Sequence, residues 1–302
     1  MDVIGLGALN YDRLYLVERI AKPGEEIGII DRKESSGGSA ANTIVGLSRL
    51  GLECGFVGCV GGDAEGEKIL QDFLDDHVDV TGIKRSSSKR SGSVIGFVDK
   101  AGERVLYVDA GANDDLTIDD IDLDYLKKAA LIHTSSFVDK TQLRMQIELA
   151  RTLKNELEIT FSPGMLCFKY GLDDLRELIE HAAITFLSQS ELLALTGLEL
   201  SRASELLLEI SQGIIAVTLG KDGSYIAYDD RRVRVPAEPV SEKDVIDTTG
   251  AGDAYAAGFI FAYLGGEDPE TCARMGSKVA SYCIKGVGAR FLPREKDIIK
   301  IR

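Results

Sequence analysis

Cysteine and histidine are scarce in this chain of 302 residues, and neither is arranged as a metal site would require. The five cysteines show no Cys-x-x-Cys spacing, and the three histidines complete no zinc-ligand cluster. This pattern argues against a structural zinc site. It favours buried, reduced thiols, which are typical of a cytoplasmic protein.

Basic side chains are also in deficit, because 35 lysines and arginines stand against 49 aspartates and glutamates, a net charge of −14. Such a charge repels a phosphate backbone, so we expect neither a nucleic-acid nor a membrane partner. A small anion such as ATP stays compatible, because local amides, basic groups and a metal ion can hold its phosphates. The amino terminus has neither a signal-peptide pattern nor an apolar run long enough to span a membrane. We therefore expect a cytoplasmic protein.

The order of secondary structure indicates an α/β fold. Short runs rich in valine and isoleucine alternate with amphipathic stretches, such as residues 143–153, whose apolar side chains recur every three or four positions. This alternation is typical of a parallel sheet covered by helices on both faces. The length fits one large domain, or a core with a small appendage. The expected core strands begin near Val3, Gly55, Leu131, Ile159, Ile184 and Ile214.

Two segments, residues 11–35 and 83–109, interrupt the alternation. In the second, SGSVIGFVD and ERVLYVD have the pattern of consecutive strands that turn at Lys100-Ala101-Gly102 and pair antiparallel. We expect the two segments to form a small separate sheet that covers a site. The core would then comprise residues 1–10, 36–82 and 110–302. An edge extension of the main sheet is the alternative.

The strongest chemical signal is the segment DTTGAGDAYAAGF, residues 247–259. Gly250, Ala251 and Gly252 lead into a helical run, where free backbone amides can form an anion hole for a transferring phosphoryl group. Asp253 follows directly, so its carboxylate could accept the proton of an attacking hydroxyl. The competing interpretation is that Asp253 only caps the helix, since aspartate is a favoured N-cap residue.

A second segment, SSGGSAANTIVGLSRLG at residues 35–51, places Gly37 and Gly38 before a helix that carries Asn42. An asparagine one turn into a helix can bind substrate hydroxyls through both the oxygen and the nitrogen of its amide. The alternative is that the small residues only let helices pack closely.

The two segments occur in the order and separation found in the ribokinase-like, or PfkB, family of carbohydrate and nucleoside kinases, which the chain resembles over essentially its whole length. Shorter pieces of the sequence also match the family: Asn10, Asp12, GANDDLT at 111–117, TLGKDGS at 218–224, and Gly288-Ala289. This agreement favours the interpretation of Asp253 as a base over its interpretation as a helix cap. The resemblance implies a three-layer α/β/α core with a mostly parallel central sheet and a small β-sheet lid, hinged near Gly37 and Gly38.

The resemblance also implies a role for each matching residue. Asp253 would be the catalytic base, and the amides of Gly250, Ala251 and Gly252 the anion hole. Substrate hydroxyls would be bound by Asp12, Gly37, Gly38 and Asn42. The nucleotide would be bound by Glu191, Thr218, Gly220, Gly223 and Ser277. Glu191 would organise Mg²⁺ through water, and Asp247 and Thr249 would belong to a loop that holds a monovalent cation such as K⁺.

Three positions depart from the family pattern. Ser188 stands where the family usually has an asparagine three residues before the acid at Glu191, so metal or phosphate handling could differ. Ser162 replaces a common aspartate on the nucleotide side. Ser277 stands about where ribokinases carry an asparagine close to the adenine, which leaves the preference among nucleotides open.

Two other nucleotide-binding motifs fit less well. The segment GLGALN, residues 5–10, lacks the last glycine of a dinucleotide-binding fingerprint, and a strand-like run follows it. A P-loop requires serine or threonine after its Gly-Lys pair, whereas Asp222 follows Gly220-Lys221.

The sequence therefore predicts magnesium-dependent transfer of the γ-phosphoryl of ATP to a hydroxyl of a sugar or nucleoside, with a ribokinase-like activity ranked first. An adenosine-type or a fructose/6-phosphofructokinase-type activity is the alternative. For a sugar phosphate, basic lid residues would have to bind the phosphate: Arg13, Arg32, Arg85, Lys89, Arg90 and Arg104. A non-catalytic ligand-binding protein on the same scaffold is the alternative from a different class. A homodimer through the exposed lid sheet is also open.

Overall fold

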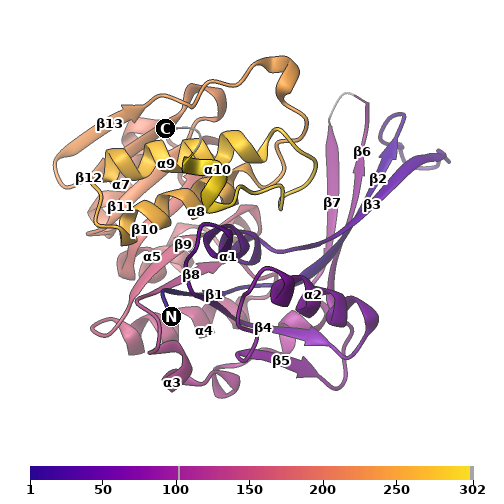
Figure 1. Cartoon of the computed structure of the whole chain (residues 1–302), viewed down its shortest axis with the longest axis horizontal. Helices are drawn as coiled ribbons and strands as arrows, with labels where there is room; N and C mark the ends of the chain where they lie inside the picture. The colour runs from indigo at the N-terminus through magenta and orange to yellow at the C-terminus, as the bar shows by residue number, and fades with distance from the viewer. Residues whose placement is uncertain (101–102, 300–302) are drawn as a thin grey trace.

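The computed structural model describes residues 1–100 and 103–299, which form two β-sheets and their covering helices (Figure 1). The strands are β1 (Val3–Leu6), β2 (Asn10–Val17), β3 (Ile29–Gly37), β4 (Cys54–Gly61), β5 (Ile83–Ser86), β6 (Gly92–Val98), β7 (Arg104–Asp109), β8 (Leu131–Ser135), β9 (Glu158–Ser162), β10 (Ala182–Ser188), β11 (Ile214–Thr218), β12 (Ser224–Tyr228) and β13 (Arg231–Val235). The α-helices are α1 (Ser39–Arg49), α2 (Ala64–Asp75), α3 (Leu123–Leu126), α4 (Lys140–Leu153), α5 (Leu172–His181), α6 (Gln189–Thr196), α7 (Leu200–Ile210), α8 (Ala251–Leu264), α9 (Pro269–Cys283) and α10 (Glu295–Ile299). Short 3-10 helices are η1 (Gly111–Asp115), η2 (Ile118–Asp120), η3 (Met165–Lys169), η4 (Gly220–Asp222) and η5 (Glu242–Asp244).

The larger sheet has nine strands in the order β13-β12-β11-β10-β9-β8-β1-β4-β5. Neighbouring strands from β11 to β5 run parallel, and only β12 and β13 add antiparallel pairs at one edge. The central strands are nearly all apolar because helices cover both faces of the sheet. The mostly parallel sheet and the six expected strand positions are confirmed.

Alternate residues of the central strands face two separate cores. In β1, Val3 packs into a core shared with α1, α2, α8 and α9, and Ile4 packs into a core shared with helices α3 to α7. This alternation is the two-residue period of a strand expressed on both sides of one sheet. The three-layer α/β/α arrangement is therefore confirmed.

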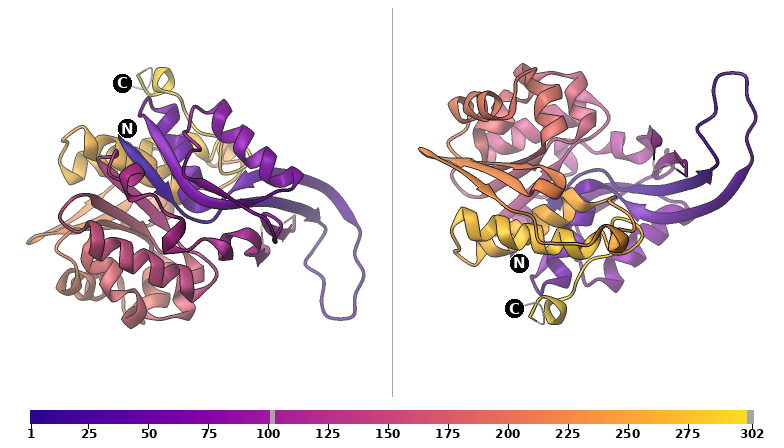
Figure 2. Two further views of the ribbon diagram at one scale, coloured as in Figure 1. Left: turned by 90° about the horizontal axis from the view of Figure 1, so that it is seen from below. Right: turned by 90° about the horizontal axis from the view of Figure 1, so that it is seen from above.

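The smaller sheet has the strand order β3-β2-β6-β7 and projects from one side of the core (Figures 1 and 2). Strands β6 and β7 pair antiparallel, as expected, and β2 pairs parallel with β6. Residues 101 and 102 of the expected turn lie outside the described residues. One boundary needs correction: β5, inside the expected lid segment 83–109, pairs with β4 of the main sheet. Its Ile83 is partly buried against the core, which explains the placement.

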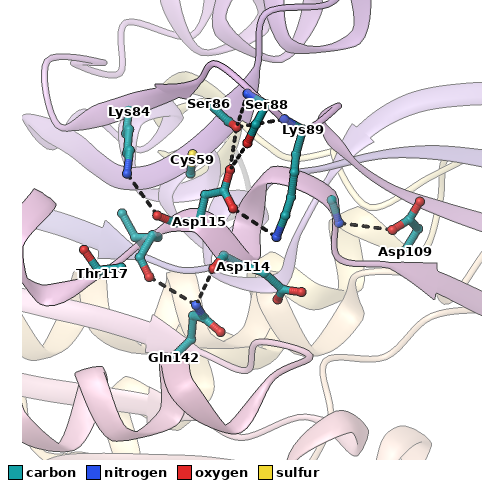
Figure 3. Close-up of polar contacts among 12 residues, drawn as sticks. Cys59, Lys84, Ser86, Ser88, Lys89, Asp109, Asp114, Asp115, Thr117 and Gln142 are labelled. Carbon is teal, nitrogen blue, oxygen red and sulfur yellow. Dashed lines mark hydrogen bonds and ion pairs between the residues drawn. The ribbon is translucent and has the colours of Figure 1, made fainter.

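The GANDDLT segment anchors the junction between the two sheets. The buried Asn113 accepts a hydrogen bond from the backbone N–H of Leu9 (2.8 Å) and donates one to the Leu9 carbonyl (3.0 Å), just where β1 gives way to β2. Its neighbour Asp115 accepts a hydrogen bond from Ser86 and pairs with Lys89 at 2.9 Å (Figure 3). These contacts explain the motif structurally, because they fix the loop that leads from β5 to the lid strand β6.

All five cysteines are buried and unpaired, in agreement with the expected reduced thiols. Burial raises the pKa of each thiol, which makes the reactive thiolate rare. Among the described residues, none of the helices combines the length and the apolar character that crossing a membrane requires.

Candidate active site

Two helix starts that are far apart in the sequence meet at the candidate site. The hydroxyl of Ser39, the first residue of α1, donates to Asp253 Oδ1 at 2.6 Å. One turn further along α1, Asn42 Nδ2 donates to Asp253 Oδ2 at 2.9 Å. Asp253 lies in the first turn of α8, 214 residues after Ser39. The structure therefore brings the early glycine pair and the late DTTGAGD segment together.

Each of these two helices begins at a glycine that no other residue could replace without strain. Gly38 precedes α1 with φ 110°, and a Cβ there would lie 2.1 Å from the carbonyl oxygen of Ala8. Gly250 precedes α8 with φ 78°, and a Cβ there would lie 2.5 Å from Ala289 Cα. Both glycines have a positive φ, a region of backbone conformation that residues with a side chain rarely adopt. The sequence needs glycine here to aim the helix starts.

The N-cap glycines of α1 and α8 have no side chain that could cap the first-turn amides, although in α1 the Ala40 N–H donates to Ser135 Oγ at 3.0 Å. By contrast, aspartates cap α2, α4 and α9. Uncapped amides at a helix start, with the positive end of the helix dipole, are suited to bind an anion. No side chain caps the amides of the predicted anion hole at Gly250, Ala251 and Gly252, but the Ala251 N–H already donates to the Thr248 carbonyl at 3.2 Å.

Asp253 does not cap its helix. Gly250 is the N-cap, and the Asp253 carboxylate turns toward α1 instead, where both of its oxygens accept hydrogen bonds. The interpretation of Asp253 as a helix cap is thus wrong. The physical reason is that an N-cap needs non-helical backbone one position before the helix, whereas Asp253 is the third helical residue.

The environment of Asp253 adjusts its proton affinity. Burial raises the pKa of Asp253 to about 6, although hydrogen bonds from Ser39 and Asn42 oppose the shift; the charge of Glu191 adds to it. The second acid of the site, Asp12, has a pKa raised to about 7, mainly by burial and partly by Asp253. The charge of Arg290 opposes both shifts. A carboxylate with a pKa near neutrality can both take and return a proton.

A cavity of about 420 Å³ opens at the start of α8. The predicted residues that line it are Asp253, Gly250, Ala251, Gly252, Glu191 and Thr218. They come from the first turn of α6, which directly follows β10, from the carboxyl end of β11 and from the start of α8. The carboxyl ends of parallel strands are where α/β folds bind ligands. The departing residues Ser162 and Ser188 also line the cavity.

Glu191 and Ser188 hold each other at the start of α6. Ser188 Oγ accepts from the Glu191 N–H at 3.2 Å, and Glu191 Oε2 accepts from the Ser188 N–H at 2.7 Å, which makes a capping box. The serine that replaces the family asparagine therefore has a structural role, while the acid still lines the cavity.

The remaining predicted nucleotide residues do not line this cavity. Gly223 has φ 90°, and a Cβ there would lie 2.0 Å from the Val235 carbonyl oxygen, so the turn into β12 explains this glycine. Gly220 lies in the same turn, in η4. The hydroxyl of Ser277 accepts from the Glu238 N–H at 2.7 Å. Their nucleotide roles stay predictions.

Asp247 organises a loop next to the cavity. Its carboxylate accepts from the N–H of Thr249 at 2.9 Å and from the N–H of Gly288 at 2.8 Å. Burial alone would raise the pKa of Asp247, but these hydrogen bonds more than offset it, so the pKa is lowered. A cation role for Asp247 and Thr249 stays a prediction.

Sequence reasoning missed two residues of the site. Ser39 lies inside the GGSAAN motif, and its position directly after Gly38 is a signal that could have pointed to it. Arg290 donates from Nε to Asn42 Oδ1 at 3.1 Å. A single arginine in an irregular loop has no local signal, because only the tertiary fold brings that loop to α1.

Known proteins match this chain over most of its length. The profile of the pfkB family carbohydrate kinases matches residues 2–296. An uncharacterized sugar kinase of Archaeoglobus fulgidus is 41% identical over 254 residues, 84% of this chain and 100% of that protein. A nucleoside kinase of Methanothermobacter thermautotrophicus is 29% identical over 289 residues, 96% of this chain and 91% of that protein. The crystal structure of Methanocaldococcus jannaschii nucleoside kinase, an archaeal member of the ribokinase family, superimposes with a TM-score of 0.85 at 26% identity, covering 99% of this chain and 97% of that one.

These matches define the class as kinases of sugars and nucleosides with the ribokinase fold. The chain belongs to the pfkB family of carbohydrate kinases. It is therefore an enzyme of the phosphotransferase class, as the sequence predicted.

Proposed function

We propose that this kinase transfers the γ-phosphoryl of ATP to a hydroxyl of a sugar or nucleoside, with Asp253 as the catalytic base. The observation that supports this most is the placement of the Asp253 carboxylate between the glycine-led starts of α1 and α8, at the edge of a cavity. Such a carboxylate can accept a proton beside amides that stabilise the phosphoryl charge.

In this mechanism the acceptor hydroxyl gives its proton to Asp253. The hydroxyl oxygen forms a bond to the γ-phosphorus, the bond from that phosphorus to the bridging oxygen breaks, and ADP leaves. The amides of Gly250, Ala251 and Gly252 would face the charge on the phosphoryl oxygens, with Ala251 sharing its N–H between the phosphoryl group and the Thr248 carbonyl. Holding the hydroxyl and the phosphorus in line supplies most of the catalysis, because little covalent chemistry is left for the protein.

Mg²⁺ would neutralise charge on the β- and γ-phosphates when it enters with ATP. The described residues contain no group of three acidic, histidine or cysteine side chains able to hold a metal ion by themselves. Proteins usually bind Mg²⁺ through one or two carboxylates together with waters and substrate phosphates. Glu191 is the acid on the cavity wall suited to such an outer contact through water.

A neutral acceptor such as ribose or a nucleoside is favoured over a sugar phosphate. Four of the basic residues that could bind a sugar phosphate are already in ion pairs within the chain: Arg13 with Glu65, Arg85 with Glu67, Lys89 with Asp115, and Arg90 with Glu65. Breaking these pairs would cost part of the binding energy of a phosphate. Arg104 lines the cavity but approaches Thr249, at 3.4 Å.

The direct test is an ADP-release assay with ATP, Mg²⁺ and a panel of D-ribose, D-fructose, fructose 6-phosphate, ribose 1-phosphate and nucleosides. We expect turnover with D-ribose or a nucleoside, and loss of that turnover in Asp253→Asn. Equal rates in wild type and Asp253→Asn would remove Asp253 as the base. Tight ligand binding without ADP release would favour the alternative of a non-catalytic binding protein. The similarity to a nucleoside kinase argues against that alternative.

The lid offers surface for a second copy of the chain. Ile29, Ile30 and Tyr107 on its outer strands are 55%, 52% and 63% exposed. Unpaired edge strands with apolar side chains favour pairing with another sheet. We propose a homodimer through the lid, and Ile30→Asp should shift the mass measured by light scattering toward the monomer.

A further inference from the structure

Arg290 contacts Asn42 of the candidate site but leaves most of its hydrogen-bonding capacity unused. It follows Ala289 in the loop between α9 and α10, and its Nε donates to Asn42 Oδ1. Its guanidinium lies 5.4 Å from the centre of the Phe73 ring. The terminal nitrogens Nη1 and Nη2 are both shielded from solvent and have no hydrogen-bond partner. Buried donors of this kind are costly unless something pairs with them.

The neighbouring acids do not explain these unused donors. Asp72 and Asp76 both raise the pKa of Arg290, so they lie within electrostatic reach. Asp76, however, accepts two hydrogen bonds from Arg49, at 2.7 and 2.8 Å. Asp72 accepts from Ser36 at 2.7 Å and from Lys68 at 2.6 Å. Both acids are therefore satisfied by other groups.

Asp12 has the complementary deficiency. Its Oδ1 is buried without a hydrogen-bond partner. Its carboxyl lies so close to Gly37 that a Cβ on Gly37 would be 2.2 Å from Asp12 Oδ2. The charge of Arg290 lowers the pKa of Asp12, and the charge of Asp12 raises the pKa of Arg290. Among the hydrogen bonds of the described residues, none joins these two side chains. An acceptor without a partner and two nitrogens without partners therefore lie within electrostatic reach of each other and of Asp253.

We propose that Arg290 determines acceptor specificity: its Nη groups and Asp12 Oδ1 bind neighbouring hydroxyls of the acceptor, away from the phosphorylated one, while its Nε positions Asn42 against Asp253. The inference rests on the proposed function. A hydroxyl both donates and accepts, so a hydroxyl pair satisfies both sets of groups. A phosphate or carboxylate would satisfy Arg290 but would place negative charge beside Asp12. The favoured acceptor is a neutral polyol, such as ribose or the ribose of a nucleoside.

The test compares acceptors that differ by one hydroxyl. The kcat/KM of the wild type, Arg290→Gln and Arg290→Lys would be measured with D-ribose against 2-deoxy-D-ribose, and with adenosine against its 2′-deoxy and 3′-deoxy forms. We expect wild type to lose about 10- to 100-fold when the contacted hydroxyl is removed, as is typical of hydrogen bonds to charged groups. In Arg290→Gln, removing the same hydroxyl from the acceptor should lower kcat/KM by less than about 3-fold, because the arginine that binds this hydroxyl is already absent.

Arg290→Lys keeps the charge but cannot contact both Asn42 and the hydroxyls. We expect Arg290→Lys to fold normally and to discriminate between the acceptors as poorly as Arg290→Gln. If Arg290→Gln does not fold, Arg290→Lys provides the same test. Arg49→Gln is the matched control, because Arg49 lies in the same cluster and donates to the Arg290 carbonyl at 2.7 Å. It should lower the melting temperature and leave the hydroxyl discrimination unchanged.

The outcomes separate the two proposals. If wild type phosphorylates none of the acceptors, the proposed function fails, and this inference fails with it. If wild type is active and both Arg290 variants keep its full discrimination, only the role of Arg290 is overturned. If the Arg290 variants selectively lose turnover of ribose 1-phosphate or fructose 6-phosphate, Arg290 binds a phosphate and the hydroxyl assignment is wrong.

Discussion

Asp253 and Glu191 are both the third residue of a helix whose start lines the same cavity, yet they are used differently. Glu191 turns back to its own helix start, because the N-cap Ser188 offers it a partner. Asp253 has a glycine as N-cap, so its carboxylate is not held locally and reaches across to Ser39 and Asn42. The comparison teaches that the N-cap residue decides whether a first-turn acid stabilises its own helix or serves the neighbouring one.

The largest expected effect comes from removing the charge of Asp253. Asp253→Asn should lower kcat by about 10²- to 10⁴-fold, the range that general base catalysis supplies. Asp139→Asn, which changes an aspartate that caps α4, is the control and should leave kcat unchanged. A kcat within threefold of wild type for Asp253→Asn would contradict the proposed base.

The same substitution should stabilise the fold at high pH. The folded-state pKa of Asp253 is raised, so its contribution to stability is fully present below the unfolded pKa and is lost as pH rises through about 6. At pH 8 the ionised carboxylate therefore costs stability, and Asp253→Asn should melt a few degrees higher than wild type. At pH 4 the difference should shrink. A lower melting temperature at pH 8 would contradict the assigned environment.

Next in size is the glycine that begins α8. Gly250→Ala should lower kcat by about 10- to 100-fold, because a Cβ would meet Ala289 and displace an amide of the anion hole. Strain at this φ should also cost about 1–3 kcal/mol of unfolding free energy. Gly197→Ala is the matched control: Gly197 has φ 68° at the end of α6 but open space around it. Gly197→Ala should lower the free energy of unfolding, measured with urea, and leave kcat unchanged.

A smaller effect is expected from Ser39, which donates to Asp253. Ser39→Ala should reduce kcat/KM at pH 6 by about 10-fold. The pH at which kcat/KM reaches half its maximum should rise, because the Ser39 hydrogen bond lowers the pKa of Asp253. In wild type this midpoint should lie near 6, with activity lost as pH falls. An unchanged midpoint would disconnect Ser39 from the base.

The smallest effect is expected from Glu191. Glu191→Gln keeps a capping-box residue, so the melting temperature should stay within about 2 °C of wild type. Loss of its charge should move the pH midpoint of kcat/KM downward, opposite to Ser39→Ala, because Glu191 raises the pKa of Asp253. Its KM for ATP·Mg²⁺ should rise several-fold if it contacts the metal through water. Equal midpoints in Glu191→Gln and wild type would show that the two acids are independent.

Residues with a local signal could be read from the sequence. The valine- and isoleucine-rich runs predicted the parallel strands, and Gly38 and Gly250 predicted two special helix starts. The position of β5 could not be read, because pairing with β4 rather than with the lid is decided by contacts between segments distant in the chain. For the same reason the capping role of Ser188 was not foreseen, although serine followed three residues later by glutamate is a known pattern.

By itself the sequence determined the layered α/β fold, the pfkB family and the two glycine-led segments that frame the site, because periodicity and short motifs are local properties of a chain. Only the tertiary structure decided which groups meet: Ser39 and Asn42 on Asp253, and Arg290 on Asn42. Proton affinity and unpaired donors depend on burial and on neighbours from other segments, and those are set by packing.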